Sequence, residues 1–345
     1  MKYVAAAKGN EHHIITFDGR DSELGAFAEL RGVAVSPRNE VFVIEKELCQ
    51  VQIFNLKGAY VHHFPTVVSR SEDVSLDGSM PAPGHPLFMC TRDGEWRKYG
   101  ESSERTYNLF LPHRIAADRQ GFLWVVGMVN VRYSHAELNN ISTVDWMCPT
   151  DRVVQYNRNG VGLATFGIRH GTCIDGMAVD PRNDHIALMG WKDSYMKVYI
   201  FRPDGSVVRT LVRKERLVPF SSTLAVNRDG NIFVPTRTGT VQVYNETGQF
   251  LFSFGSYESG DGELKAPRDI CTDRYGNVIV ADRKNKRVSV FTSRGQFVHH
   301  VAIGLTVEHI AVGPEGQLVV TYPVDNGGIG MHGRPVRYNV SILCP

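Results

Sequence analysis

Short runs of alternating apolar and polar residues fill this chain, and each run ends in a turn rich in Gly, Asn or Asp. The clearest unit spans 266–301, with runs at 268–272, 278–281, 287–291 and 296–301. Alternation with a period of two is typical of β-strands, and the tight turns between the runs indicate antiparallel neighbours. The unit therefore predicts one sheet of four short strands. Such a sheet exposes too much of its faces to be stable without copies of itself.

Copies of this unit recur along the chain about every 45 residues, a spacing typical of propeller blades. The turn between the first two strands recurs at Asn39, Gly121, Asp184, Gly230, Gly276 and Gly316, and the turn between the last two at Gly58, Gly160, Gly205, Gly248 and Gly295. Glycine favours these turns because a positive φ costs least without a Cβ.

The sixth unit ends the chain without a fourth strand, whereas residues 12–17 form a spare strand near the beginning. We therefore predict an all-β fold, a six-bladed β-propeller of four-stranded antiparallel blades. Residues 12–17 would complete the last blade and close the ring, which removes exposed sheet edges. A length of 345 residues is then compatible with one domain over 1–345, because each blade packs mainly on its neighbours.

Two long segments interrupt the repeat, at 65–110 between the first two blades and at 127–150 within the second blade. In a propeller, the connection from strand four to the next strand one and the connection from strand two to strand three emerge on the same face. Both insertions are therefore expected on one face. They are either decoration or binding loops, and their aromatic residues, among them Trp96 and Trp146, favour a contact surface.

The charges nearly balance, with 38 Lys and Arg against 36 Asp and Glu, which gives no support for duplex DNA as a partner. None of the six cysteines lies in a C-x-x-C pair, so we expect reduced thiols and a cytoplasmic protein. The sequence contains no signal peptide and no apolar run of the roughly 18 residues that span a bilayer, so no membrane partner is expected. It also lacks a phosphate-binding glycine loop and a G-x-S-x-G nucleophile motif, so we expect no cofactor and no catalytic residue.

The unit at 267–295 reads P-x-x-I-x-x-D-x-x-G-N-V-I-V-A-D-x-x-N-x-R-V-x-V-F-x-x-x-G and resembles an NHL repeat. The whole pattern is similar to the C-terminal NHL domains of tripartite-motif ubiquitin ligases. That resemblance implies a propeller that selects a partner, while separate RING and B-box zinc modules recruit the ubiquitin machinery. The sequence has no Cys/His cluster with the spacing of those modules. We therefore expect a binding module, not an enzyme by itself, that serves as a substrate-recognition or scaffold module linked to ubiquitin ligation.

Candidate binding residues gather where the first strands begin, close to the central channel and on the face of the insertions. The aligned positions are Arg31, His113, Asp175, Ser222, Arg268 and Glu308, and the loops between strands two and three add Lys46, Trp191, Lys192, Arg237, Arg283, Lys284 and Lys286. A tryptophan beside cations suits a peptide or an unstacked base. The charges equally suit a solvated rim on which opposite signs pair with one another.

Three functions fit this face to different degrees. A protein or peptide is the favoured partner. Single-stranded RNA is the alternative, because the resemblance implies RNA binding for some family members and because residues 283–287 are basic, although acidic residues in the insertions oppose phosphates. A remote alternative is a peptide-amidating lyase; these enzymes resemble NHL propellers and bind zinc through three histidines at first-strand starts. Here only His113 occupies such a position, so no metal site is expected.

Overall fold

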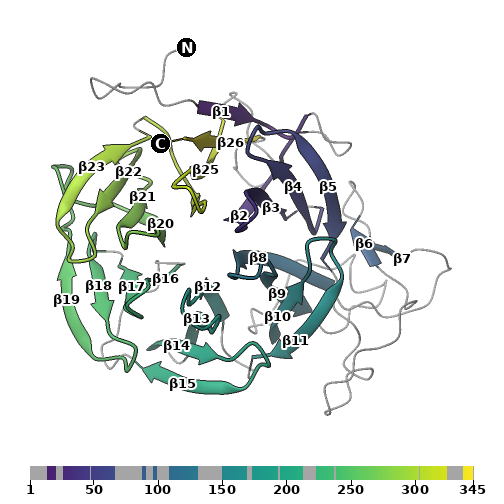
Figure 1. Cartoon of the computed structure of the whole chain (residues 1–345), viewed down its shortest axis with the longest axis horizontal. Coiled ribbons are helices and arrows are strands. Elements are labelled where there is room, and N and C mark those ends of the chain that lie inside the picture. Colours follow the sequence, from purple (N-terminus) through teal and green to yellow (C-terminus); the bar gives the residue numbers. More distant parts are fainter. Residues whose placement is uncertain are drawn as a thin grey trace, which may run out of the picture.

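A computed structural model describes residues 14–20, 26–46, 48–66, 88–90, 96–98, 109–130, 150–168, 173–192, 195–212, 223–236, 238–302, 304–324 and 337–344. Six four-stranded antiparallel sheets stand side by side in a ring around a central axis (Figure 1). The strands are β1 (Ile14–Phe17), β2 (Leu30–Val35), β3 (Glu40–Glu45), β4 (Gln50–Asn55), β5 (Tyr60–Pro65), β6 (Phe88–Cys90), β7 (Trp96–Lys98), β8 (Leu109–Ala117), β9 (Leu123–Asn130), β10 (Thr150–Tyr156), β11 (Gly162–Gly167), β12 (Cys173–Val179), β13 (Ile186–Lys192), β14 (Tyr195–Phe201), β15 (Val207–Val212), β16 (Ala225–Val226), β17 (Ile232–Pro235), β18 (Val241–Tyr244), β19 (Phe250–Phe254), β20 (Pro267–Thr272), β21 (Val278–Asp282), β22 (Arg287–Phe291), β23 (Phe297–Val301), β24 (His309–Val312), β25 (Leu318–Pro323) and β26 (Tyr338–Leu343). The predicted six-bladed propeller is confirmed.

Blades 1 to 5 are β2–β5, β8–β11, β12–β15, β16–β19 and β20–β23, and blade 6 consists of β24–β26 and β1. Strand β1 pairs antiparallel with β26, from Ile14 opposite Leu343 to Phe17 opposite Val340 (Figure 1). The ring closure expected from the N-terminal strand is therefore confirmed for 14–17. Residues 12 and 13 lie outside the described residues.

The turn positions expected from the repeat all adopt positive φ angles. Asn39 and Asp184 have φ of 63° and 59°, and the nine expected glycines lie between 74° and 93°. Two faces of the propeller follow from this pattern. We call the face with these short turns the turn face, and the face with the connections between blades and between strands two and three the connection face.

The hydrophobic core is divided into six layers, one between each pair of neighbouring blades. Because successive side chains of a strand point to opposite faces of the sheet, one strand contributes apolar side chains to two layers. In β3, Phe42 and Ile44 pack toward blade 2, whereas Val41 and Val43 pack toward blade 6. Every blade therefore stabilises both of its neighbours, and the ring has no single centre of packing.

The two insertions interrupt the chain before the first strand of blade 2 and between its second and third strands. Strand β5 ends at Pro65 and β8 begins at Leu109, with the hairpin β6–β7 between them; β9 ends at Asn130 and β10 begins at Thr150. The remainder of 65–110 and 127–150 lies outside the described residues, so the extents of the insertions stay predictions. In the described part of the chain, no helix is long and apolar enough to cross a membrane.

Candidate binding face around the central channel

Four of the first strands carry a β-bulge at the end that opens on the connection face. In β2, Leu30 stands opposite Glu45 and Gly32 opposite Ile44, so Arg31 is the inserted residue. The same shift of register falls at His113, Asp175 and Arg268 in blades 2, 3 and 5. A bulge bends its strand and re-aims the side chains beside it, and bulges are frequent next to functional sites. Four of the six residues aligned from the sequence are therefore bulge residues.

The residues directly after the aligned positions line the channel itself. Arg114, Thr223, Asp269 and His309 border a cavity of ≈190 Å³ together with the inner edges of all six first strands. Sequence reasoning missed these four residues because it expected one inward position in each strand. A signal was present: the aligned residue and its successor are both polar in blades 2, 4, 5 and 6, which breaks the alternation of a regular strand.

Asp269 connects three blades at the channel. Its Oδ1 accepts a hydrogen bond from Thr223 Oγ1 of blade 4 at 2.7 Å, and its Oδ2 accepts one from the amide of Ile310 of blade 6 at 2.9 Å. His309 Nδ1 lies 3.6 Å from Oδ2. Burial acts to raise the pKa of Asp269, but His309, Arg114 and the Ile310 amide outweigh it and hold this pKa below its usual value. Asp269 is therefore an ionised group that joins neighbouring blades.

The pKa values of two other buried groups at the channel are also lowered, but for these bases the shift disfavours the charged form. Burial lowers the pKa of His309 below its usual value, and the Asp269 carboxylate offsets this only in part, so His309 is neutral at pH 7. Burial also lowers the pKa of Arg114 to about 10, which leaves it charged; its Nη1 donates to the carbonyls of Arg31 and His113 at 3.1 and 2.7 Å. Both shifts have the same cause, the poor solvation of a positive charge inside the ring.

Three of the cations predicted for this face, Arg31, Lys46 and Arg283, have a carboxylate partner on the same face. Glu29 lies between Arg31 Nη2 at 2.5 Å and Lys46 Nζ at 3.3 Å. Arg283 Nη2 lies 3.3 Å from Glu308 Oε1 in the next blade. The alternative that opposite charges on the rim pair with one another is thus realised, with Glu29 as an acid that the sequence alignment had not included.

The remaining predicted residues fall into three groups. Lys284 and Lys286 are exposed on the connection between β21 and β22. Trp191 and Lys192 end β13 on the corresponding connection of blade 3, as the alignment expected. Arg237 and Ser222 lie outside the described residues, as does most of the acidic sequence of the insertions.

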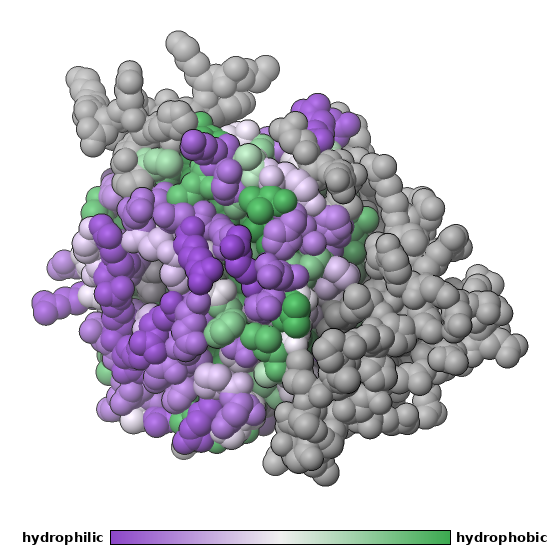
Figure 2. All heavy atoms as spheres, turned by 45° about the vertical axis from the view of Figure 1, so that its right-hand side comes forward, coloured by the Kyte–Doolittle hydropathy of each residue, from purple (hydrophilic) through white to green (hydrophobic). Residues whose placement is uncertain are grey.

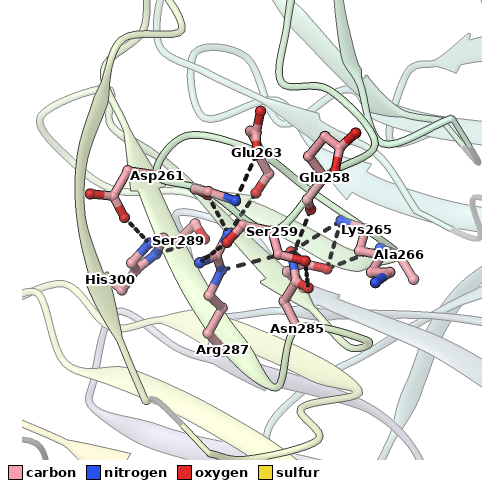
Figure 3. A network of polar contacts seen from close by, with 12 residues as sticks. Glu258, Ser259, Asp261, Glu263, Lys265, Ala266, Asn285, Arg287, Ser289 and His300 are labelled. Carbon is pink, nitrogen blue, oxygen red and sulfur yellow. Dashed lines mark hydrogen bonds and ion pairs between the residues drawn. The ribbon is translucent and has the colours of Figure 1, made fainter.

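A network of hydrogen bonds fixes the connection that enters blade 5 (Figure 3). Asp282, at the end of β21, accepts the backbone amides of Lys265 and Ala266 at 3.1 and 2.9 Å. Arg287 donates to the carbonyls of Ser259, Gly260 and Glu263 at 3.1, 2.7 and 2.9 Å. Arg287 was part of the basic run that permitted RNA binding, but only 11% of its side chain is exposed. It holds the loop instead of facing a ligand.

The same arrangement, a carboxylate that accepts two backbone amides of the preceding connection, recurs in blade 1, where Glu45 ends the second strand. Its two carboxylate oxygens accept the amides of Ala28 and Glu29 at 3.2 and 2.9 Å. Glu45 and Asp282 are both almost fully buried. An acid at the end of strand two therefore fixes the connection into its own blade, and with it the rim of the connection face.

His300 adds a second anchor to the blade 5 connection (Figure 3). Its Nδ1 lies 3.1 Å from Ser289 Oγ, and its Nε2 lies 3.1 Å from Asp261 Oδ1. This order of residues resembles a hydrolase triad, but Ser289 is 0% exposed, so no substrate reaches its hydroxyl. His113, the histidine that the sequence alignment placed at a first-strand start, faces Asp151 at 3.6 Å. Within the residues that the structure describes, no three His, Cys, Asp or Glu side chains gather to hold a metal ion.

This architecture defines a closed six-bladed propeller with a polar channel and a rim of fixed connections. The family model for the NHL repeat matches residues 264–291, the unit that contains Asp282 and Arg287. NHL-repeat-containing protein 4 from Homo sapiens is 33% identical over 99 residues, which cover 28% of this chain and 79% of that protein. The chain belongs to the NHL-repeat family.

Other relatives match over shorter stretches. Protein lin-41 from Caenorhabditis elegans is 52% identical over 48 residues, which are 14% of this chain and 4% of that protein. The E3 ubiquitin-protein ligase TRIM71 from Xenopus tropicalis is 49% identical over 47 residues, 14% of this chain and 6% of the ligase. The matches thus span only a small part of these two relatives. Among solved structures, a luciferin-regenerating enzyme superposes with a TM-score of 0.56 at 11% identity, over 97% of this chain and 96% of that one, a likeness of fold alone.

Proposed function

We propose that this chain is a recognition module that binds a protein or peptide on its connection face. The observation that carries the proposal is the pairing of charges there: Glu29 is shared by Arg31 and Lys46, and Glu308 pairs with Arg283. Paired charges of both signs complement another protein surface, whereas a polyanion needs unpaired cations along its path.

The rigidity of the rim supports the same proposal. Asp282 and Arg287 hold the blade 5 connection through backbone amides and carbonyls, so its exposed side chains are presented in one arrangement. A surface that is ordered before binding loses less conformational entropy when a partner docks. Among the coloured residues in view in Figure 2, hydrophilic side chains predominate, with smaller hydrophobic groups between them.

The link to ubiquitin ligation is the finer part of the proposal. It is supported by the similarity to a ubiquitin-protein ligase, which extends over 47 residues of this chain. In such a role the propeller would select the protein to be modified, and the transfer chemistry would belong to a separate zinc module. The propeller would then bind its partner equally well in the absence of the ubiquitin enzymes.

The test is affinity capture from extracts of cells that express the chain, with and without RNase. Captured proteins are then purified and titrated against the chain by fluorescence anisotropy. The double variant Lys284→Glu/Lys286→Glu should weaken the interaction by about tenfold, as expected when two exposed rim charges are reversed. Arg294→Glu reverses an exposed charge in a turn of the opposite face and serves as the matched control.

Two outcomes would contradict the proposal. If partners disappear with RNase, and single-stranded RNA binds with a log–log salt slope near −0.7 for each phosphate contact, the ligand is RNA. If the double variant and the control bind alike, the connection face of blade 5 is not the binding surface.

A further inference from the structure

The turn face has its own opening into the channel, separate from the surface proposed above. Six short turns surround a hollow of ≈400 Å³, and each blade contributes residues to its lining. The sequence pattern marked this face only by the shortness of its turns. The residues that line this hollow nevertheless share a pattern, because the first and second positions of each turn carry particular residue types.

Acidic side chains at the first position of these turns are directed into the turn. Asp118 Oδ1 accepts the amides of Gln120 and Phe122, both at 2.9 Å, and its Oδ2 accepts the indole N–H of Trp124 at 3.1 Å. Asp273 accepts the amides of Tyr275 and Asn277 at 2.9 and 2.8 Å in the same way. Their hydrogen-bonding capacity is therefore used to form the turns, and none of it is directed toward a ligand.

Cations or prolines occupy the second position, which lines the opening. Arginines stand there in blades 2, 4 and 5 and prolines in blades 1, 3 and 6, namely Arg119, Arg228, Arg274, Pro37, Pro181 and Pro314. A proline fits this position because its fixed φ matches the turn. The lining thus holds three guanidinium groups, and its two carboxylates, those of Asp118 and Asp273, are engaged in the turns.

The three arginines differ in the groups that contact their guanidinium. Arg119 forms a bidentate pair with Asp184, at 3.0 and 2.9 Å. Arg274 contacts neutral groups: its Nη1 donates to the carbonyl of Pro314 at 3.2 Å, and its guanidinium lies 4.7 Å from the centre of the Tyr275 ring. Arg228 is exposed, and among the described residues no side chain forms a hydrogen bond or ion pair with it.

From this geometry we infer that the mouth of the channel on the turn face binds carboxylate side chains of an acidic peptide segment. Arg228 and Arg274 are two exposed guanidinium groups without a carboxylate in contact, and they border one hollow. A guanidinium presents paired N–H donors that match the two oxygens of a carboxylate. Tyr275, 72% exposed beside Arg274, adds an aromatic surface of the kind enriched at protein interfaces. This site is on the opposite side of the ring from the proposed partner surface and does not depend on it.

The inference is tested with fluorescein-labelled twelve-residue peptides of alternating Glu and Gly, titrated with the full chain by anisotropy at two salt concentrations. The matched probes are the same peptide with Gln and the same peptide with phosphoserine in place of Glu. We expect the Glu peptide to bind at least about tenfold more tightly than the Gln peptide, and less tightly at high salt. Arg228→Gln/Arg274→Gln should reduce its affinity about tenfold, and Arg228→Lys/Arg274→Lys by less, because lysine keeps the charge but not the paired donors.

Arg294→Gln is the control variant, since Arg294 is exposed in a turn of the same face but outside the hollow. It should change the affinity of the Glu peptide by less than about twofold. An equal loss in this control would mean general charge attraction, and equal binding of the Gln peptide would exclude carboxylate recognition. Binding of the phosphoserine peptide alone would overturn the assignment to carboxylates. Lys284→Glu/Lys286→Glu should leave all three titrations unchanged, so failure here is distinguishable from failure on the connection face.

Discussion

Replacing Asp282 with alanine should release the connection that enters blade 5. Three donors lose their acceptor: the amides of Lys265 and Ala266, and Asn285 Nδ2, which lies 2.7 Å from Oδ2. Asp282 itself is 0% exposed, so water does not replace it without rearrangement. At about 1 kcal/mol for each lost hydrogen bond, the free energy of unfolding should fall by about 3 kcal/mol.

Urea unfolding followed by circular dichroism measures this loss of unfolding free energy. In a thermal melt, Tm should fall by about 6 °C, at roughly 2 °C per kcal/mol for a large domain. Hydrogen exchange locates it: the amides of 258–266 should exchange faster, while those of blades 2 and 3 stay protected. Glu258→Ala removes an exposed carboxylate from the same loop and should change stability by less than about 0.5 kcal/mol. A loss below about 1 kcal/mol in the Asp282 variant, with unchanged exchange in the loop, would refute the role of the network.

Three further predictions concern the ring as a whole. The folded-state pKa of Asp269 is below its ordinary 3.8, so the stability that this carboxylate contributes is complete above pH 3.8 and is lost as pH falls through the folded pKa. The folded-state pKa of His309 is below its ordinary 6.5, so the free energy of unfolding declines as pH falls below 6.5. The urea midpoint of His309→Gln should decline less than that of the parent across this range. Gly176→Ala would bring a Cβ to 2.9 Å from backbone of blade 4 and should cost about 1–3 kcal/mol, whereas Gly167→Ala, with no neighbour within 4 Å, should be almost neutral by the same thermal melts. Deleting β1 with the residues before it leaves β26 an exposed edge and should abolish cooperative unfolding; a truncated chain that melts like the parent would disprove closure by β1.

The blades were predictable from the sequence because their determinants are local. A positive φ favours glycine wherever the turn occurs, so the spacing of Gly121, Gly230, Gly276 and Gly316 reported the repeat directly. The spare N-terminal strand also followed from local pattern, because an apolar run without a partner and a blade without a fourth strand complement each other. Both expectations needed no knowledge of contacts between distant residues.

The candidate site was predictable only in outline, because its geometry depends on contacts between blades. The bulges at Arg31, His113, Asp175 and Arg268 shift the channel-lining position by one residue, and alternation alone does not reveal such a shift. The role of Arg287 was hidden for a related reason. Its partners are backbone carbonyls of the preceding connection, and a carbonyl has no signature in the sequence.

The bulges have a consequence for how the mouth of the channel can change. A bulge residue is additional to the ladder, so the strand below it keeps its register whatever side chain the bulge carries. Substitutions at these positions should therefore alter the chemistry at the rim of the channel mouth without disturbing the apolar layers between blades. The chemistry of the rim and the packing of the fold are therefore carried by separate sets of residues, although the two sets are adjacent in the chain.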